Sequence, residues 1–247
     1  GFAAANNQAL WKAKGKYVLF LNNDTKFEDN VIKKIFDFSE NVSDDVIVGC
    51  ELKNSDGTRQ NSIMKFPSLW NSFTENFFLY KIFPKSKCFN KYYQNLLHFN
   101  NPVEVDEIKG AFMFCTLSAI KKQGFDERFF FYSEETDLCY RFKKNGGKIY
   151  FFPFNSIIHY EGGIEDKDLL FYHKNLSIGK IKFYQKHFKR IKFCISLLFH
   201  YIGIAFRIPL YLLSGLFLFR KQLLKKSMIY LQTLFIYPKN LFKNNKY

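Results

Sequence analysis

Residues 16–25, KYVLFLNNDT, decide the fold that this sequence predicts. The run 16–21 is almost entirely apolar and β-forming, which is typical of a strand buried on both faces of a parallel sheet. The polar cluster 22–25 favours a turn. We expect helices at 3–14 and 29–39, on either side of this strand. Helix, strand, polar loop and helix in this order indicate an α/β domain of the doubly wound type.

The rest of the first two thirds of the chain continues this pattern. We expect strands at 46–52, 103–116, 148–152 and 156–159, and a helix at 133–145. The pair Asp56-Gly57 predicts a tight turn, because glycine adopts the positive φ that such a turn needs. Residues 66–99 are aromatic and lysine-rich without a clear period. We expect them to form a variable insertion over the active site.

Charge is segregated along the chain. Of the 37 Lys and Arg residues, 15 lie between Lys174 and Lys246, and the last acidic residue is Asp168. The first 168 residues thus carry the remaining 22 basic residues against 22 acidic ones, and the net charge of +15 belongs to the C-terminal part. Such one-sided charge attracts nucleic acid or anionic lipid. Because the basic residues flank long apolar runs, we favour a membrane surface and expect no nucleic acid.

The apolar segment 193–219 leaves the mode of membrane association open. Its length allows one crossing, which needs about 20 mainly apolar residues. Arg207 and Pro209 interrupt its middle, however, and lysines follow it, which suits helices that lie in the headgroup region of an anionic leaflet. We prefer the interfacial mode on these grounds. A soluble hydrophobic appendage or a dimer contact is the remaining alternative.

Asp24 is the first candidate for chemistry, because it follows the C-terminal end of a predicted buried strand. In open α/β sheets, ligands bind outside these strand ends. A carboxylate there can hold Mg²⁺ or Mn²⁺ while substrate phosphates and water fill the other positions. An ordinary polar turn that caps the next helix explains the same tetrapeptide equally well.

A second candidate is the acidic start of the helix expected at 133–145. Ser133 is a good N-cap and places Glu134 and Glu135 in the first turn, where the helix dipole favours ionised carboxylates. An ionised carboxylate in an aromatic-walled site is a suitable general base for a hydroxyl group. Solvated capping charges are the more common explanation. Asp137 and Arg141, four residues apart, are expected to form a structural pair.

His159 is a conditional candidate. A lone histidine is more often a satisfied core or surface residue than a ligand. It becomes a candidate metal ligand if Asp24 and Glu135 share its crevice, since an imidazole can complete a metal shell.

Seven short motifs follow one another across residues 1–163. They are Gly1-Phe2-Ala3 with Asn6-Asn7, LNNDT at 21–25, Gly57 with FPSL at 66–69, Val105-Asp106 with Gly110-Ala111, GFDERFF at 124–130, Glu134-Glu135 with Asp137-Leu138-Cys139 and Arg141, and His159 with Gly162-Gly163. Each motif is weak alone. Their order and spacing resemble the family 2 glycosyltransferases, and within them the rhamnosyltransferase-like branch of polysaccharide assembly.

The resemblance implies an α/β, A-type glycosyltransferase (GT-A, Rossmann-like) fold and an inverting reaction. A sugar, with rhamnose as a candidate, would move from a nucleotide-diphosphate donor to a lipid-linked surface polysaccharide or O-antigen acceptor. By position, Asp24 would bind Mg²⁺ or Mn²⁺, with His159 completing the shell. Glu135 would be the catalytic base, with Glu134 as its rival.

The resemblance also implies substrate contacts. These are expected from Asn7, Asn23, Asp106, Gly110 and Ala111. Two positions depart from the family pattern: a Glu stands at 135 in place of Asp, and Thr116 stands in place of Arg. The first nucleotide-binding strands are expected upstream of Gly1, so we expect this fragment to be inactive by itself.

The expected organisation is a catalytic domain at 1–190, incomplete at its N-terminus, followed by membrane-associated helices at 191–247. This places the enzyme at the cytoplasmic face of the bacterial inner membrane, beside a lipid-linked acceptor. Five widely spaced cysteines without a CxxC pair indicate buried, reduced thiols. Two other classes of function remain: a nucleic-acid-binding protein with a basic aromatic tail, and an inactive membrane scaffold with a transferase fold.

Overall fold

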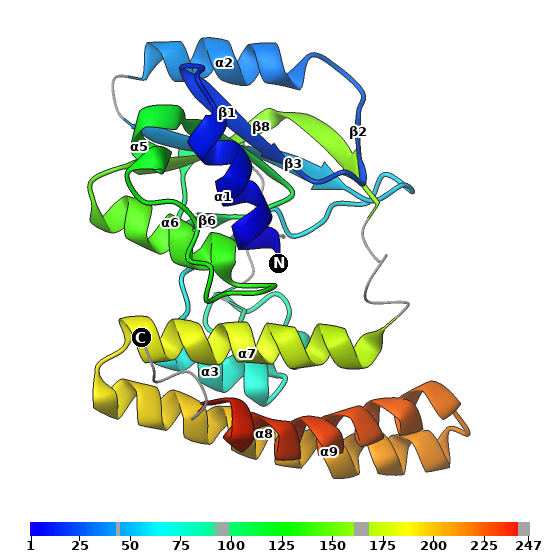
Figure 1. Cartoon of the computed structure of the whole chain (residues 1–247). Coiled ribbons are helices and arrows are strands. Elements are labelled where there is room, and N and C mark those ends of the chain that lie inside the picture. Colours follow the sequence, from blue (N-terminus) through cyan, green and yellow to red (C-terminus); the bar gives the residue numbers. More distant parts are fainter. Residues whose placement is uncertain (43–44, 91, 93–98, 161–167, 242–247) are drawn as a thin grey trace. The chain divides into compact units, whose positions relative to one another are not determined.

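The computed structural model describes residues 1–42, 45–90, 92, 99–160 and 168–241. The chain forms two compact units, one of residues 1–66 and 91–162 and one of residues 67–90 and 163–247. The first is a layered α/β unit and the second is helical (Figure 1). This division does not follow the predicted boundary at residue 190, because α7 (Leu169–His187) contacts the two helices after it. The catalytic and membrane roles of 1–190 and 191–247 stay predictions.

The α/β unit is built on a mixed sheet. Its strand order is β1 (Tyr17–Leu21), β7 (Phe112–Thr116), β3 (Val46–Lys53), β8 (Lys148–His159) and β2 (Thr25–Phe27), with β5 (Val103–Glu104) also paired to β8. Only β3 and β8 are parallel among the described strand pairs of this sheet. A separate ribbon joins β4 (Ile63–Met64) to β6 (Glu107–Ile108). The α/β class is confirmed, whereas the doubly wound parallel arrangement was wrong.

The strand expected at 16–21 is β1, but it is neither fully buried nor parallel to its neighbour. Within the described residues β1 pairs only with β7, antiparallel, and Leu21 at its end is exposed. The central strand is β3, which is buried along almost its whole length. An apolar β-forming run does not by itself distinguish a central strand from a strand with one neighbour, because both bury at least one face.

Two apolar cores cover the two faces of the sheet (Figure 1). One face carries Ile47 and Met113 and packs against α1 (Phe2–Lys12), α5 (Leu117–Lys121) and α6 (Glu134–Lys144). The opposite face carries Val48 and Phe114 and packs against α2 (Val31–Asn41). Neighbouring strand residues thus alternate between the cores, as the period of two requires.

Local predictions mostly hold. Helices expected at 3–14 and 133–145 are α1 and α6, and Gly57 has φ +82° in the turn that Asn54 closes with Thr58. The two strands expected at 148–152 and 156–159 are one strand, β8, with an irregular register opposite Cys50 and Glu51. Pro153 lies in this irregularity, where a residue without an N–H is tolerated. Cys88 and Cys194 are exposed, so the expectation of five buried thiols was wrong.

The helical unit contains α3 (Leu69–Asn76), α4 (Leu79–Ile82), α7, α8 (Arg190–Phe217) and α9 (Lys221–Leu241). Residues 67–90, which belong to the variable insertion expected at 66–99, supply α3 and α4 and fold with this unit. Ile181, Ile204 and Tyr230 form its core, and α8 contacts α3, α7 and α9. By length and composition alone, α8 is apolar enough to cross a membrane.

Candidate active site

The candidate site lies where several strand ends meet. β1, β3 and β8 run in one direction and β7 and β2 in the other, so the ends of β1 and β8 share an edge with the starts of β7 and β2. Asn22 N–H donates to Ala111 O (3.1 Å), and Tyr160 N–H donates to Asp24 O (2.8 Å). The loop that contains Asp24 is therefore held by the strands on both sides of it.

His159 is the buried centre of this edge. Its Nε2 atom lies 3.3 Å from Asp24 Oδ1 and 3.2 Å from Asn22 Nδ2. Its Nδ1 atom lies 2.9 Å from Gln60 Oε1. The Gln60 amide donates to His159 O and to Asn54 Oδ1, so its oxygen is left to accept from Nδ1–H. This network assigns the proton of the neutral ring to Nδ1 and leaves the Nε2 lone pair facing Asp24.

The contact between Asp24 and His159 fits a bound cation. A carboxylate oxygen and an imidazole nitrogen 3.3 Å apart attract each other when a proton on the ring or a metal ion lies between them, and Asp24 Oδ1 is buried without a hydrogen-bond partner. A carboxylate oxygen and an imidazole nitrogen can share a divalent ion whose other ligands are phosphate and water. The nitrogen suits Mn²⁺ better than the harder Mg²⁺. Among the described residues, no group of three His, Cys, Asp or Glu side chains is placed to hold a metal.

The start of α6 has an unusual backbone. Tyr132 and Ser133 both have φ +68°, and the Ser133 hydroxyl does not cap the helix. A capping side chain needs a backbone near the extended region, so the predicted Ser133 cap was wrong. Left-handed residues other than glycine cost about 1–3 kcal/mol each and are concentrated at functional sites. The strained turn delivers Glu134 and Glu135 together to the first turn of the helix.

Burial, and not the helix dipole, controls the protonation of the two carboxyl groups. Burial raises the pKa of Glu134 to about 9, and the neighbouring charge of Glu135 adds to the effect. Burial also raises the pKa of Glu135, against which the positive charge of Lys109 acts. Glu134 therefore keeps its proton near neutral pH, while the charge of Lys109 favours the ionised form of Glu135. Burial thus acts against the ionised form that the position at a helix start had led us to expect for both groups.

Gly110 connects the two halves of the site. A Cβ atom at this position would lie 3.5 Å from Cβ of Glu135, an ordinary contact distance, so Gly110 lies directly beside Glu135. The next residue, Ala111, is the one that accepts from Asn22. Asp24 and His159 are therefore in direct contact, and Glu135 adjoins their loop through two backbone residues.

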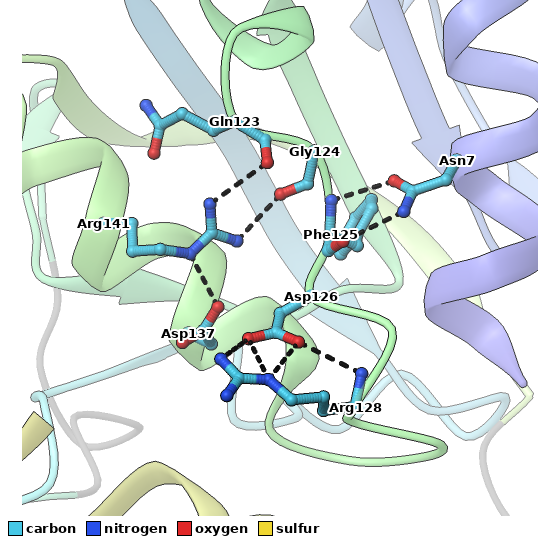
Figure 2. Close-up of polar contacts among 8 residues, drawn as sticks. All are labelled: Asn7, Gln123, Gly124, Phe125, Asp126, Arg128, Asp137 and Arg141. Carbon is cyan, nitrogen blue, oxygen red and sulfur yellow. Dashed lines mark hydrogen bonds and ion pairs between the residues drawn. The ribbon is translucent and has the colours of Figure 1, made fainter. Parts of the chain in front are cut away.

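Asn7 has a structural role in place of the predicted substrate contact. Its Oδ1 atom accepts from Phe125 N, and its Nδ2 donates to Phe125 O and to Glu127 Oε1, all at 2.9 Å. Figure 2 shows the Asn7 amide facing Phe125. Every polar hydrogen of the buried amide is used, so none remains for a ligand.

The same loop is held from its other side by Arg141. Its guanidinium donates to Asp137 (2.7 Å) and to the carbonyl oxygens of Gln123 and Gly124, as Figure 2 shows. The predicted structural pair of Asp137 and Arg141 is confirmed. The GFDERFF motif is thus a loop between α5 and α6 that hydrogen bonds hold on both sides. It leads into the first turn of α6, which carries Glu134 and Glu135.

Two other predicted substrate contacts have different surroundings. Asn23 is exposed in the turn after β1. Asp106 is partly buried and lies 3.4 Å from Lys65 Nζ and 3.3 Å from Lys143 Nζ. A substrate hydroxyl at Asp106 would have to share that carboxylate with two lysines. The Gly162-Gly163 pair lies outside the described residues. Sequence reasoning missed the contacts of Gln60 and Asn22 with His159: no motif covers Gln60, and Asn22 was noted only as part of LNNDT.

Comparison with known proteins agrees with this arrangement. The model of the family described as Glycosyl transferase family 2 matches residues 1–114. The resemblance to this family is thereby confirmed, and the mixed α/β sheet fits a GT-A fold.

One curated relative narrows the class. Rhamnosyltransferase WbbL of Escherichia coli (strain K12) is 28% identical over 173 residues, which cover 65% of this chain and 61% of the relative. The match thus spans about three fifths of that protein. The chain is thus similar to family 2 glycosyltransferases over residues 1–114 and to a rhamnosyltransferase over 173 residues.

Replacing Asn7 tests the loop clamp. Asn7→Ala leaves Phe125 N–H and C=O without partners in a buried position, so we expect the free energy of unfolding to fall by about 1–3 kcal/mol. Asn6→Ala is the matched control, because Asn6 donates only to Phe2 O of its own helix. Urea unfolding followed by far-UV circular dichroism measures both. Equal, small losses in the two variants would contradict the clamp.

The protonation of Glu134 has a signature in stability. Its pKa is raised from the ordinary 4.5 to about 9, so the folded state holds a proton that the unfolded state releases. The free energy of unfolding should therefore fall as pH rises between these two values. Glu134→Gln should flatten this slope, whereas Glu40→Gln on the exposed side of α2 should keep it. Urea unfolding at about pH 6 and about pH 8 tests this, and equal slopes in all three proteins would reject a protonated Glu134.

Proposed function

We propose that this chain forms the catalytic part of an inverting glycosyltransferase. It moves a sugar, with rhamnose as the first candidate, from a nucleotide-diphosphate donor to a lipid-linked surface polysaccharide or O-antigen acceptor. The observation that carries the proposal is that Asp24 contacts His159 at the strand edge where Ala111 binds the Asp24 loop and Gly110 lies beside Glu135. The family match and the rhamnosyltransferase relative support the reaction class.

Glu135 is the catalytic base in this proposal. The charge of Lys109 favours its ionised form. Its carboxylate accepts the proton of the acceptor hydroxyl while the new bond forms to the anomeric carbon and the bond to the diphosphate breaks. Attack from the face opposite the leaving group inverts the anomeric configuration. A raised pKa strengthens such a base, because proton transfer is most efficient when the pKa lies near the working pH.

Glu134 has a different part to play. With its proton retained, it is a hydrogen-bond donor and not a second base. One neutral and one charged carboxyl group side by side also avoid the repulsion that two buried charges would create. On this division of roles we assign the base to Glu135 and not to Glu134.

Asp24 and His159 are the residues that would hold the metal. A divalent cation at this pair neutralises charge that develops on the departing diphosphate. Gln60 and Asn22 keep the His159 ring in place, and second-shell contacts of this kind tune ligand affinity. Asn23, Gly110 and Ala111 line the adjoining loop and strand start, and we assign them to the donor and acceptor sugars together with Asp106.

The acceptor and the location follow from the C-terminal part. A lipid-linked acceptor presents its reactive end at a membrane surface, and residues 191–247 supply cationic, apolar helices suited to an anionic leaflet. We therefore place the enzyme at the cytoplasmic face of the bacterial inner membrane.

Replacing the two glutamates separately tests the proposal in the full-length enzyme. Glu135→Gln should lower kcat by about 10²-fold or more and leave donor binding within about twofold, because it removes only the proton acceptor. Glu134→Gln should cost less than about tenfold, since its amide still donates a hydrogen bond. Glu40→Gln is the surface control. Sugar transfer from a panel of nucleotide sugars is the assay.

Two outcomes contradict the proposal. If Glu135→Gln keeps substantial turnover, the base is wrongly assigned. If the unmodified enzyme transfers or hydrolyses no nucleotide sugar with Mn²⁺ or Mg²⁺ present, the scaffold alternative replaces the transferase.

A further inference from the structure

The outward surface of α8 is apolar throughout its C-terminal two thirds. From Leu198 to Phe219, every exposed residue is apolar. Among these, Leu213 is 65% exposed, Phe217 84% and Phe219 93%. A helix that faces water normally carries polar residues on its solvent side. This face of α8 therefore has the composition of a surface that is covered by something apolar.

From Ser196 onward, the polar residues of α8 are buried or half-buried and point the opposite way. Arg207 donates to Glu75 O (2.8 Å), and its guanidinium lies 4.8 Å from the centre of the Phe78 ring. Ser196 and His200 are buried. Gly203 lies against Asn76, whose Cβ would be 2.6 Å from a Cβ added at that position. The helix is thus inverted relative to a soluble one, with polar groups inside the unit and apolar groups outside.

The charge distribution around this face favours a lipid bilayer, and not a second copy of the chain, as the apolar material that covers it. No acidic residue follows Asp168, whereas 15 basic residues do. Glu75, within the helical unit, is already paired with Lys180 at 2.9 Å. Lys221 and Lys225 are exposed at the start of α9, directly after the apolar face. Two copies that met through this face would bring like charges together, while an anionic bilayer neutralises them.

The packing of α8 also decides how it meets the bilayer. α3 and α7 contact α8, and the Glu75–Lys180 ion pair joins these two helices beside it. If α8 crossed the membrane, this ion pair and Arg207 would have to enter the hydrocarbon, which is costly for charged groups. The four cations Arg220, Lys221, Lys225 and Lys226 would also have to reach the far side.

We propose that α8 lies in the plane of an anionic bilayer surface. The face from Leu198 to Phe219 sits among the acyl chains, the lysines at the start of α9 sit at the headgroups, and Arg207 fastens the helix to residues 75–78. This inference rests on the membrane association proposed above and adds its orientation. It resolves the choice between crossing and interfacial helices from contacts that the sequence does not contain.

Vesicle binding tests the face. The full chain should bind vesicles of phosphatidylcholine with phosphatidylglycerol, and more weakly when salt is raised or phosphatidylglycerol is omitted. Leu213→Glu with Phe217→Glu should weaken binding at least about tenfold, because two exposed apolar side chains leave the bilayer. Gln222→Glu, an exposed polar position on α9, is the matched control and should change binding less than about threefold. Wild-type binding by the double variant, or its conversion of a dimer to a monomer without effect on binding, would overturn the proposal.

Cysteine accessibility tests the orientation. Lys192→Cys and Lys221→Cys are introduced separately in a chain with Cys88→Ser and Cys194→Ser, because those two native thiols are exposed. After binding to sealed vesicles, both new thiols should react with a membrane-impermeant maleimide added outside. Protection of the thiol at 221 until detergent is added would show a crossing helix and overturn the proposal. Failure of the wild-type chain to bind vesicles would remove membrane association, while sugar transfer assayed with a soluble acceptor would still support the transferase.

Discussion

The site depends on the approach of Asp24 Oδ1 to His159 Nε2, two acceptor atoms held 3.3 Å apart. Neighbouring parts of the chain hold both side chains in this position. The pairing of Thr25 with His159 joins β2 to β8, and Gln60 fixes the ring from behind. A positive charge between the two atoms stabilises this contact, and in the proposed function a divalent cation supplies that charge.

The other half of the site, the Glu134–Glu135 pair, likewise consists of polar groups that are buried without a full set of partners. The strained turn at Tyr132 and Ser133 starts α6 so that two consecutive carboxyl groups face inward. Burial favours the neutral form of both, and the charge of Lys109 favours the ionised form of Glu135. The clamp of Asn7 and Arg141 on the preceding loop keeps this costly arrangement in place. Keeping the carboxyl groups in this defined geometry therefore lowers the stability of the fold.

The sequence predicted local features better than their arrangement. The bounds of α6, between Ser133 and Gly146, and the Asp-Gly turn at 56–57 follow from short-range rules, and both are present. The parallel pairing expected for β1 was wrong, because strand order depends on pairing with residues far along the chain. Ser133 failed as a cap, and the structural contacts of Asn7 were not foreseen, for a similar reason. The backbone conformation at residue 133 and the loop that Asn7 contacts both depend on tertiary structure, so the residue type alone does not predict them.

Binding of Mn²⁺ in the presence of the donor's nucleoside diphosphate tests the central claim most directly. Electron paramagnetic resonance of the full-length protein should show bound Mn²⁺ with nitrogen coupling from an imidazole. Asp24→Asn should weaken the ion at least about tenfold, and His159→Ala should abolish the nitrogen coupling, while Asp37→Asn on α2 should change neither. Unchanged affinity in Asp24→Asn, together with no nitrogen coupling in the wild-type protein, would contradict the account.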